Sequence, residues 1–245
     1  MPISQAVAAD SMRLEGIAGR TALVTGSSSG IGLRVAETLR AFGARVAGVD
    51  VAAAATEIDL ALTADVSDEG QIEEAFAETE RRLGAVEILV TCAGIFEPAA
   101  IADLDLATWR RTLDINLTGT FLCAKRALGL MRPAGFGRIV TISSGAGIDG
   151  GTEACAHYAA SKGGVIVLSK ALAKESVADG VTVNVVAPRN VRTPMIADLA
   201  DGLAAQVPGG RLGEPDDVAA AVAFLCSAHA SYFSGEVLVL NGGWW

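Results

Sequence analysis

The sequence predicts an α/β fold, a single Rossmann-type doubly wound domain of about seven parallel strands flanked by helices on both faces. Three observations lead to this prediction. Short apolar runs alternate with longer amphipathic patterns, which is typical of a parallel sheet with right-handed helical crossovers. The short runs are apolar throughout, as expected of strands that are buried on both sides. Hydrophobic residues make up 51% of the 245 residues, which is enough for a substantial core.

The expected elements follow in chain order. Strands are expected at Thr21–Thr25, Arg45–Val49, Leu60–Ala64, Ile88–Cys92, Arg138–Ile142, Val181–Ala187 and Val237–Leu240. Helices are expected at 31–42, 69–83, 106–131, 158–178 and 215–227. Two helix starts carry their own signals: Asp68 with Gln71 has the form of a reciprocal cap, and Pro215 precedes two aspartates at a positive dipole end. Since ligands of such sheets bind beyond the carboxyl ends of the strands, polar residues that follow strands should converge there.

The chain is expected to consist of a short leader and one domain, and that domain contains a loop that covers a ligand site. Residues 1–11 form a small, Ala-rich leader that we expect to be poorly ordered, and 12–245 then form one domain. Within that domain, the Pro/Gly-punctuated segment 188–211 is expected to cover a ligand site as a substrate loop. No apolar run reaches the length of about 18 residues that a membrane span needs, and the first residues do not resemble a signal peptide. We therefore expect a cytoplasmic protein with no membrane partner.

Charge and residue usage argue against a nucleic-acid-binding protein and against a metalloprotein. The net charge is −9, from 28 acidic and 19 basic residues, whereas a nucleic-acid surface requires a basic patch. The four cysteines (Cys92, Cys123, Cys155 and Cys226) are scattered, and we expect buried free thiols in a reducing compartment. With only two histidines in the chain, no metal site is expected.

A glycine-rich turn follows the first predicted strand. The segment Thr25-Gly26-Ser27-Ser28-Ser29-Gly30-Ile31-Gly32 leads from that strand into an amphipathic helix. A strand, a glycine turn and a helix N-terminus together offer free backbone N–H groups and a positive dipole end to a phosphate. The spacing is G-x3-G-x-G, whereas the commoner dinucleotide fingerprint is G-x-G-x-x-G. Alone, the turn indicates little, because many α/β loops contain one.

A second motif places a tyrosine and a lysine four residues apart, in Tyr158-Ala159-Ala160-Ser161-Lys162. On a helix, side chains with this spacing lie on one face, with Cβ atoms about 5–6 Å apart. A nearby cation favours phenolate, so we expect the pKa of Tyr158 to lie well below the usual value of about 10. A phenol tuned in this way can exchange a proton with an alcohol or ketone near neutral pH. The pair alone recurs by chance on many helices.

Together with further motifs from about Arg13 onward, these stretches resemble the short-chain dehydrogenase/reductase family in its shorter form. The matching segments are TGSSSGIG, Thr91-Cys92-Ala93-Gly94, Asn116 in Ile-Asn-Leu-Thr-Gly, Ser143-Ser144 after a strand, YAASK, Pro188, Thr193-Pro194-Met195, Gly213–Ala219 and Ser234-Gly235-Glu236. The ordered set is far more specific than any single motif. The resemblance implies an oxidoreductase that transfers a hydride between a nicotinamide cofactor and a secondary alcohol or ketone.

The resemblance also implies the catalytic roles. Tyr158 would be the general acid/base, and Lys162 would lower the tyrosine pKa and bind the nicotinamide ribose. Ser144 would hydrogen-bond the substrate oxygen, and Asn116 would hold a water that completes a proton relay. We take Ser144 as the catalytic serine, rather than Ser143, because its separation from the tyrosine is nearer the family's usual value.

The resemblance places the cofactor along the carboxyl edge of the sheet. The implied cofactor-binding residues are Gly26, Ser28, Ser29, Gly30, Ile31, Gly32, Asp50, Asp65, Val66, Ala93, Gly94, Tyr158, Lys162, Pro188 and Thr193. Asp50 ends the second predicted strand, where an aspartate accepts hydrogen bonds from the adenosine ribose and repels a 2′-phosphate. The expected cofactor is therefore NAD, with NADP less favoured. The alternative is that Asp50 only caps a turn.

The chain departs from the family pattern at two places. Thr91-Cys92 replaces the usual Asn-Asn, which affects local stability more than chemistry. Arg189 replaces the glycine of the usual Pro-Gly pair, and Arg192 stands three residues further on. Because arginine suits bidentate binding of carboxylate or phosphate, one hypothesis is that either residue recognises an anionic substrate or touches the cofactor pyrophosphate. The alternative is that both face solvent or pair with Asp198 or Asp201.

His157 and the C-terminal tryptophans are further aromatic residues whose roles can be predicted. His157 precedes the tyrosine, and since successive helical residues point in different directions, a packing or surface role is favoured over a place in the pocket. The segment Trp244-Trp245 is a candidate for subunit contacts, because aromatic residues are enriched at interfaces and relatives of this kind are usually tetramers. A homotetramer is therefore expected, with a dimer as the other possibility. The alternative is that the tryptophans fold onto their own subunit.

Two other functions stay open. A 3-oxoacyl-carrier-protein reductase would use NADPH and need a basic docking face, to which Arg126, Arg132, Lys170 and Lys174 would contribute weakly. Asp50 argues against NADPH. A non-catalytic dinucleotide-binding scaffold or sensor is allowed by the fold alone, but the joint presence of the four implied catalytic residues argues against it.

Overall fold

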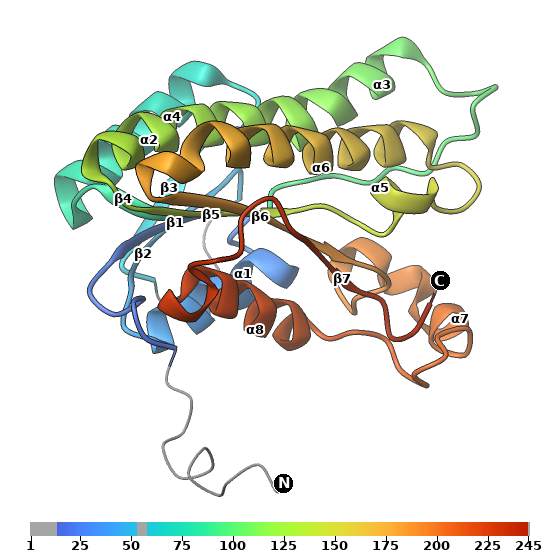
Figure 1. Cartoon of the computed structure of the whole chain (residues 1–245). Coiled ribbons are helices and arrows are strands. Elements are labelled where there is room, and N and C mark those ends of the chain that lie inside the picture. The colour runs from blue at the N-terminus through green and yellow to red at the C-terminus, as the bar shows by residue number, and fades with distance from the viewer. Residues whose placement is uncertain (1–13, 53–57, 245) are drawn as a thin grey trace, which may run out of the picture.

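The protein is built around a seven-stranded parallel β-sheet (Figure 1). The computed structural model describes residues 14–52 and 58–244, without the side chains of 198–201. The strands are β1 (Thr21–Thr25), β2 (Arg45–Asp50), β3 (Leu60–Thr63), β4 (Val86–Thr91), β5 (Gly137–Ile142), β6 (Val181–Pro188) and β7 (Val237–Leu240). Their order in the sheet is β3-β2-β1-β4-β5-β6-β7, and all neighbours run parallel. The predicted doubly wound α/β fold is confirmed, whereas the predicted leader 1–11 lies outside the described residues.

Helices cover both faces of the sheet. They are α1 (Gly30–Ala41), α2 (Glu69–Leu83), α3 (Leu106–Leu113), α4 (Gly119–Ala134), α5 (Ala146–Asp149), α6 (Ala156–Ser176), α7 (Ala200–Ala204) and α8 (Pro215–Cys226), with 3₁₀ turns at Val177–Asp179, Pro194–Leu199 and Ala228–Ala230. Figure 1 shows α2, α4 and α6 along one face and α1 and α8 along the other. The short helices α5 and α7 were not expected from the sequence; they lie in the loops at the carboxyl edge.

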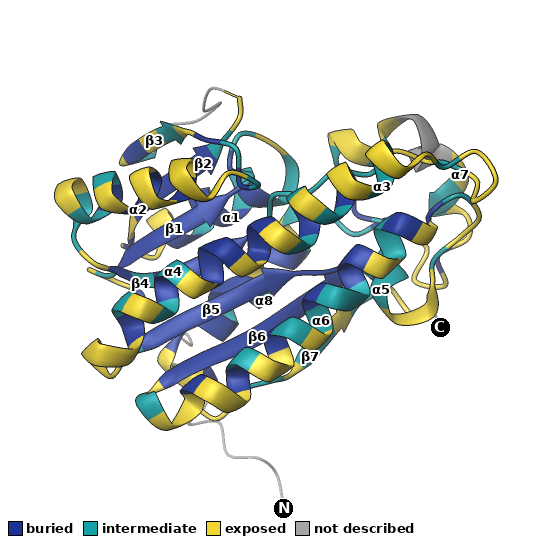
Figure 2. Ribbon diagram, turned by 90° about the horizontal axis from the view of Figure 1, so that it is seen from above, coloured by how far each residue is buried: buried dark blue, intermediate teal, exposed yellow. Residues whose placement is uncertain are grey.

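Strand residues alternate between two apolar cores. Leu23 of β1 packs into the core under α2 and α4, whereas its neighbour Val24 packs into the core under α1 and α8. Ile139 and Val140 of β5 divide in the same way. The central strands are therefore buried on both sides (Figure 2), which is the physical reason for their continuous apolar runs.

The sheet reverses its winding at β1. The chain passes from β1 outward to β2 and β3 and then returns to β4, on the other side of β1. Ligands of open α/β sheets bind at the carboxyl ends of the strands beside such a reversal. The loops that follow β1 and β4 meet there, since a Cβ on Gly26 would lie 2.8 Å from the Cα of Ala93.

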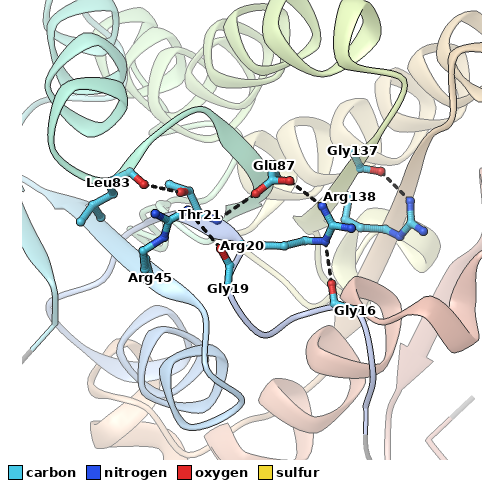
Figure 3. Close-up of polar contacts among 9 residues, drawn as sticks. All are labelled: Gly16, Gly19, Arg20, Thr21, Arg45, Leu83, Glu87, Gly137 and Arg138. Carbon is cyan, nitrogen blue, oxygen red and sulfur yellow. Dashed lines mark hydrogen bonds and ion pairs between the residues drawn. The ribbon is translucent and has the colours of Figure 1, made fainter.

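The opposite edge of the sheet is held by a polar cluster that contains none of the predicted site residues (Figure 3). Arg20 pairs with Glu87 at 2.5 Å and donates to the carbonyl of Gly16 at 2.8 Å. Arg138 is buried beside it and donates to the carbonyl of Gly137 at 2.9 Å. Burial lowers the pKa of Arg138. Arg20 and Glu87 therefore tie the amino ends of β1 and β4 together, while the carboxyl ends carry the loops of the site.

The predicted helix 106–131 is interrupted. A π-helical turn, Asp114–Thr118, separates α3 from α4, and α4 continues past the predicted end to Ala134. At the centre of this turn lies Asn116, which is fully buried. The prediction of one continuous helix is wrong because the side-chain periodicity does not reveal the extra residue of a π turn, a feature that is frequent at functional sites. Other boundaries shift by about two residues, as is common for helix and strand ends.

Two expectations from composition can be compared with the described residues. All four cysteines lie in the described part of the chain and are free thiols; Cys92 is partly exposed and the other three are buried. Within residues 14–52 and 58–244, none of the helices combines the length and the apolar character that a membrane crossing requires.

Gly32 lies where α1 packs against the glycine turn. A Cβ at this position would lie 2.0 Å from the carbonyl oxygen of Gly26, a backbone atom next to β1. Because the backbone would have to move, we expect Gly32→Ala to lower the free energy of unfolding by about 1–3 kcal/mol. The matched control is Gly129→Ala on the exposed side of α4, where a Cβ meets no atom within 4 Å. This control should raise the stability by about 0.5–1 kcal/mol. Urea denaturation of both variants checks the prediction, and equal stabilities would contradict it.

Candidate active site

The turn between β1 and α1 is shaped to hold an anion. Gly26 and Gly30 have φ of +67° and +53°, values that residues with a Cβ rarely adopt. Ser29 is the N-cap of α1, but its side chain makes no capping hydrogen bond. The first-turn N–H groups of α1 are therefore not taken up by a side-chain cap and can bind an anion such as a phosphate. Thr193 of segment 188–211 lies against the turn, since a Cβ on Gly30 would lie 3.4 Å from its Cγ2.

Asp50 closes β2 beside this turn. Its two carboxylate oxygens accept hydrogen bonds from the backbone N–H groups of Ser28, at 3.0 Å, and of Ala52, at 3.1 Å. Burial acts to raise the pKa of Asp50, but the hydrogen bonds from Ser28, Ala52 and Val51 outweigh it and lower the pKa. The carboxylate is thus ionised at neutral pH. It caps the turn, as the alternative interpretation held, and it also places a negative charge beside the anion cradle.

Asp65 and Val66 follow β3 on the neighbouring part of the same edge. Asp65 accepts hydrogen bonds from the backbone N–H and the hydroxyl of Ser67, at 2.9 and 2.7 Å, and Val66 is buried. Asp68 caps α2 by accepting from the N–H of Gln71 at 3.1 Å. The Gln71 side chain bonds to the Asp68 carboxylate and to the N–H of Asp65. The predicted helix start at Asp68 is therefore confirmed, but the reciprocal bond of the Gln71 oxygen goes to the N–H of Asp65 and not to that of Asp68.

Three elements converge around Gly94, which follows β4. A Cβ on Gly94 would lie 3.1 Å from Oδ1 of Asn116 and 3.3 Å from Nζ of Lys162, so no larger residue fits without displacing one of them. Asn116 donates to the carbonyl of Ile95 and to the hydroxyl of Ser161, both at 3.0 Å, and accepts from the N–H of Ile95 at 2.8 Å. Its side chain therefore holds the loop after β4. Its predicted part in a proton relay stays a prediction.

Lys162 and Tyr158 lie close together on α6, but their electrostatic coupling differs from the expectation. The Lys162 ammonium donates to the carbonyl of Ile142 at 2.9 Å and lies 5.9 Å from the centroid of the tyrosine ring. Burial lowers the pKa of Lys162 to about 8. Burial raises the pKa of Tyr158, and a hydrogen bond with Ser144 only partly offsets that effect. The expected low pKa of the phenol is therefore wrong for the chain as described, because burial dominates over the nearby cation.

The two adjacent serines have separate places. The Ser143 hydroxyl is buried and donates to the carbonyl of Lys162 at 2.8 Å, which ties the end of β5 to α6. The Ser144 hydroxyl lines the cleft, accepts from the N–H of Ala146 at 3.2 Å and hydrogen-bonds with Tyr158. Both serines line the cleft, but the Ser143 hydroxyl is bonded to the Lys162 carbonyl, whereas the Ser144 hydroxyl bonds with Tyr158. The choice of Ser144 as the serine that meets the substrate stays a prediction.

A three-residue wall, Ile95 to Glu97, stands beside Tyr158. The ring of Phe96 packs on the tyrosine ring, with centroids 4.9 Å apart. Asn116 holds the residue before Phe96, and Nε2 of the fully buried His157 hydrogen-bonds the Glu97 carbonyl at 2.9 Å. His157 therefore packs behind the wall, in agreement with the favoured packing role and not with a surface one. Phe96 lies in segment 94–99, which was expected to contribute to the pocket, but no motif marks this residue individually.

Phe96, Ser144, Tyr158 and Lys162 share one cleft of about 210 Å³ at the carboxyl edge of the sheet, whereas Asp50 and Asn116 are not among its lining residues. It is lined by Ile31, Cys92, Gly94, Phe96, Ile142, Ser143, Ser144, Ala146, Gly151, Thr152, Cys155, Tyr158, Lys162, Pro188, Arg189, Asn190, Val191, Thr193, Met195, Ile196, Leu203, Gln206 and Trp244. The walls are largely apolar. Lys162 and Arg189 are the charged residues among those described, and no acidic side chain lines the cleft.

The two arginines of segment 188–211 have different surroundings. Arg189 lines the cleft, pairs with Asp149 and has its guanidinium carbon 5.0 Å from the centroid of the Trp244 ring. Arg192 lies outside the cleft, is exposed and pairs with Glu214 at 3.1 Å. Of the two arginines, only Arg189 therefore remains a candidate for binding an anion in the cleft. The side chains of Asp198 and Asp201, offered as alternative partners, lie outside the described residues.

Trp244 folds onto its own subunit, as the alternative interpretation held. Together with Leu203 and Ala204, it packs against the buried side chains of Val207 and Leu212, and it reaches the cleft. Trp245 lies outside the described residues. Trp244 therefore has apolar partners within its own subunit, and the expected subunit contact of Trp244-Trp245 stays a prediction.

The low pKa of Lys162 has a consequence for stability. The folded chain releases this proton near pH 8, whereas an unfolded lysine keeps it to about 10.5. Since the unfolded state binds more protons between these values, the free energy of unfolding should rise with pH across that window, by about 3 kcal/mol from this group. The variant Lys162→Met lacks this contribution. Urea denaturation of both proteins across pH 8 to 10.5 tests the prediction, and identical pH dependences would contradict it.

The fold and the cleft define a class of protein. A doubly wound sheet with an anion cradle at its winding reversal suits a dinucleotide, and a buried tyrosine and lysine beside a serine suit proton exchange with an alcohol or ketone. This is the arrangement of a nicotinamide-dependent oxidoreductase.

Comparisons with known proteins identify the family. The profile described as "Enoyl-(Acyl carrier protein) reductase" matches residues 26–245. The cis-4-hydroxycyclohexanecarboxylate dehydrogenase of Sinomonas cyclohexanicum is 40% identical over 245 aligned residues, covering 94% of this chain and 98% of the relative. The 3-oxoacyl-[acyl-carrier-protein] reductase FabG of Salmonella typhimurium is 41% identical over 237 residues, covering 92% and 97%.

Solved structures agree with this relationship. Levodione reductase superimposes with a TM-score of 0.87 at 31% identity, covering 92% of this chain and 97% of that structure. The aldohexose dehydrogenase of Thermoplasma acidophilum gives a TM-score of 0.89 at 28% identity, covering 94% and 95%. The chain belongs to the short-chain dehydrogenase/reductase family. It is an oxidoreductase for alcohol or ketone substrates, and members of this family use nicotinamide cofactors.

Proposed function

We propose that the protein catalyses the NAD-dependent interconversion of a secondary alcohol and its ketone, with Tyr158 as the general acid/base. The observation that carries the proposal is the placement of Ser144, Tyr158 and Lys162 around one cleft that opens beside the glycine turn. The 40% identical hydroxycyclohexanecarboxylate dehydrogenase supports the reaction type and suggests ring alcohols as the first compounds to assay.

The residues of the carboxyl edge fit a dinucleotide. The glycine turn, from Gly26 to Gly32, would hold the pyrophosphate on the N–H groups of α1, and Asp50 would accept from the adenosine ribose. Asp65 and Val66 would flank the adenine, while Ala93, Gly94, Pro188 and Thr193 would line the path to the nicotinamide. The ionised carboxylate of Asp50 favours NAD, since a 2′-phosphate would face a like charge. When bound, the nicotinamide accepts the hydride in oxidation and supplies it in reduction.

The chain's own groups handle the proton and the oxygen. Ser144 donates a hydrogen bond to the substrate oxygen and orients it toward Tyr158. In reduction the phenol donates its proton to that oxygen, and in oxidation the phenolate removes the proton from the alcohol. The Lys162 ammonium, protonated below about pH 8, stabilises the phenolate through its positive charge. Asn116 positions the loop after β4 and is proposed to hold the water through which the proton reaches solvent.

A direct assay tests the proposed function. Purified protein is incubated with NAD⁺ or NADP⁺ and a panel of secondary alcohols, including 4-hydroxycyclohexanecarboxylate, and reduced nicotinamide is followed by its absorbance. Turnover with NAD⁺ and weak turnover with NADP⁺ would support the proposal. Turnover of no alcohol and no ketone, in a protein that binds NADH, would instead favour the non-catalytic sensor or scaffold.

A second candidate is an NADPH-dependent 3-oxoacyl-carrier-protein reductase, which the 41% identical FabG relatives favour. Two features oppose it. Asp50 disfavours NADPH, and the weak basic face is partly neutralised, because Arg126 pairs with Glu73 and Glu80 and Arg132 pairs with Asp179. Faster reduction of an acyl-carrier-protein thioester with NADPH than of any free ketone with NADH would favour this candidate.

We also propose that the protein is a cytoplasmic homotetramer, or a dimer if only one contact forms. Apolar side chains are exposed on the outer faces of two helices, at Phe121 of α4 and Val167 of α6, and on the edge strand, at Val239 of β7. Large exposed apolar patches mark protein contacts, so these positions are the ones that we propose neighbouring subunits cover. The free thiols agree with a reducing compartment.

A further inference from the structure

We propose that Arg189, backed by Trp244, is the binding subsite for a carboxylate on the substrate, so that the protein acts on compact keto or hydroxy acids. The substrate carboxylate would bind Arg189, and the reacting carbon of the substrate would lie beside Ser144 and Tyr158. This inference rests on the proposed function and names the substrate class of the same cleft.

The backbone and the side chain of Arg189 are both held in place at the cleft. Its backbone N–H donates to the carbonyl of Leu240 at 2.9 Å, which fixes the residue at the end of β6. Its side chain passes Gly145, where a Cβ would lie 3.3 Å from the arginine Cγ, and its guanidinium lies over Trp244. The side chain is only 15% exposed. A guanidinium that is already ordered loses less entropy when it binds an anion.

The guanidinium retains hydrogen-bonding capacity. It carries five N–H donors, and its Nη1 is bonded to Asp149. Among the described residues, neither Nε nor Nη2 has a hydrogen-bond partner. These two nitrogens form the edge of the fork that matches the two oxygens of a carboxylate. Asp149 therefore orients the group, and its own pKa is lowered by that hydrogen bond, while the second edge remains to bind a ligand.

The lining of the cleft also favours an anion. Lys162 and Arg189 line it, and no acidic side chain does so among the described residues. The other walls include the apolar groups Phe96, Met195 and Leu203. The volume of about 210 Å³ is small beside the roughly 300–1,000 Å³ of drug-sized ligand sites. The expected substrate thus has a small apolar body and a negative end.

Its neighbours place Arg189 on the substrate side of the cleft. They are Gly145 and Asp149, which follow Ser144 in the chain, together with Trp244. By contrast, it is Thr193, four residues further along the same segment, that approaches the glycine turn, where the pyrophosphate would bind. The contacts therefore favour a substrate carboxylate over the cofactor pyrophosphate as the partner of Arg189.

The test compares Arg189→Gln with Arg192→Gln, a matched loss of an arginine from the same loop but outside the cleft. Binding of cyclohexanecarboxylate, which has no reacting group, is measured by calorimetry with and without NADH. We expect binding to wild type and to Arg192→Gln, and an affinity at least about tenfold lower in Arg189→Gln. Cyclohexanecarboxamide, which lacks the charge, should bind weakly to all three proteins.

Turnover adds the second readout. With NADH, 4-oxocyclohexanecarboxylate and 4-methylcyclohexanone are compared as an anionic and a neutral ketone. Arg189→Gln should raise the KM for the anionic ketone at least about tenfold while changing the neutral one little. Equal effects on both ketones, or unchanged binding of cyclohexanecarboxylate, would overturn the inference while leaving the proposed function intact. Arginine-dependent binding without any turnover would overturn the proposed function and keep the anion subsite.

Discussion

Replacing Tyr158 with phenylalanine should lower kcat by about 10²–10⁴-fold, because the variant loses the group that exchanges a proton with the substrate oxygen. The ring remains, so its packing on Phe96 and the fold should persist. NADH affinity, measured by fluorescence titration, should change little. Loss of turnover with retained binding thus identifies a chemical role for the phenol.

The matched control is Tyr232→Phe, because the chain has two tyrosines and Tyr232 is fully exposed. This variant should retain wild-type kcat and wild-type stability. If Tyr158→Phe kept more than about a tenth of the wild-type kcat, Tyr158 could not be the main proton donor, since that role contributes at least about 10²-fold.

Replacing Asp50 should change the choice of cofactor. In Asp50→Ala, NADH loses a charged hydrogen-bond acceptor, which should lower its affinity about tenfold or more. NADPH loses a like-charge repulsion and should bind more tightly. Binding titrations with NADH and NADPH measure both changes. Because Asp50 also accepts from Ser28 and Ala52, Asp50→Asn provides a variant that removes the charge and keeps one acceptor.

The control for this prediction is Asp59→Ala, which also removes a carboxylate that accepts a backbone hydrogen bond at β2, from Val46 at 2.8 Å. Asp59 lies near the start of β2, whereas Asp50 lies at its carboxyl end. The control should keep the wild-type ratio of NADH to NADPH affinity. Preference of the wild type for NADPH would overturn the role of Asp50 and favour the carrier-protein reductase.

The sheet, and the approach of the sequence motifs to one another at its carboxyl edge, could be predicted because both follow from local rules. Apolar runs bounded by turns mark strands, and parallel strands bring their carboxyl ends to one edge, so the glycine turn, Gly94 and Ser144 were expected to approach one another. The identity of Asp50 as a residue beside the glycine turn could be predicted for the same reason.

Other features depend on contacts that the sequence pattern does not contain. The π turn around Asn116 adds one residue to a helix without changing its composition. The raised pKa of Tyr158 depends on how deeply α6 is buried, which the spacing of Tyr158 and Lys162 does not show. The pairing of Arg189 with Asp149 joins residues 40 positions apart, whereas the sequence suggested partners nearby.

The clamped segment from Ile95 to Glu97 separates the pocket wall from the exposed loop that follows it. Asn116 and His157 hold the segment on both sides of Phe96, and the N–H of Ala99 donates to the carbonyl of Ala154 at 2.8 Å. Beyond this point, residues 100–105 are largely exposed. Insertions at 100–104, ahead of the α3 cap at Asp105, should therefore leave the Phe96 ring in place beside Tyr158.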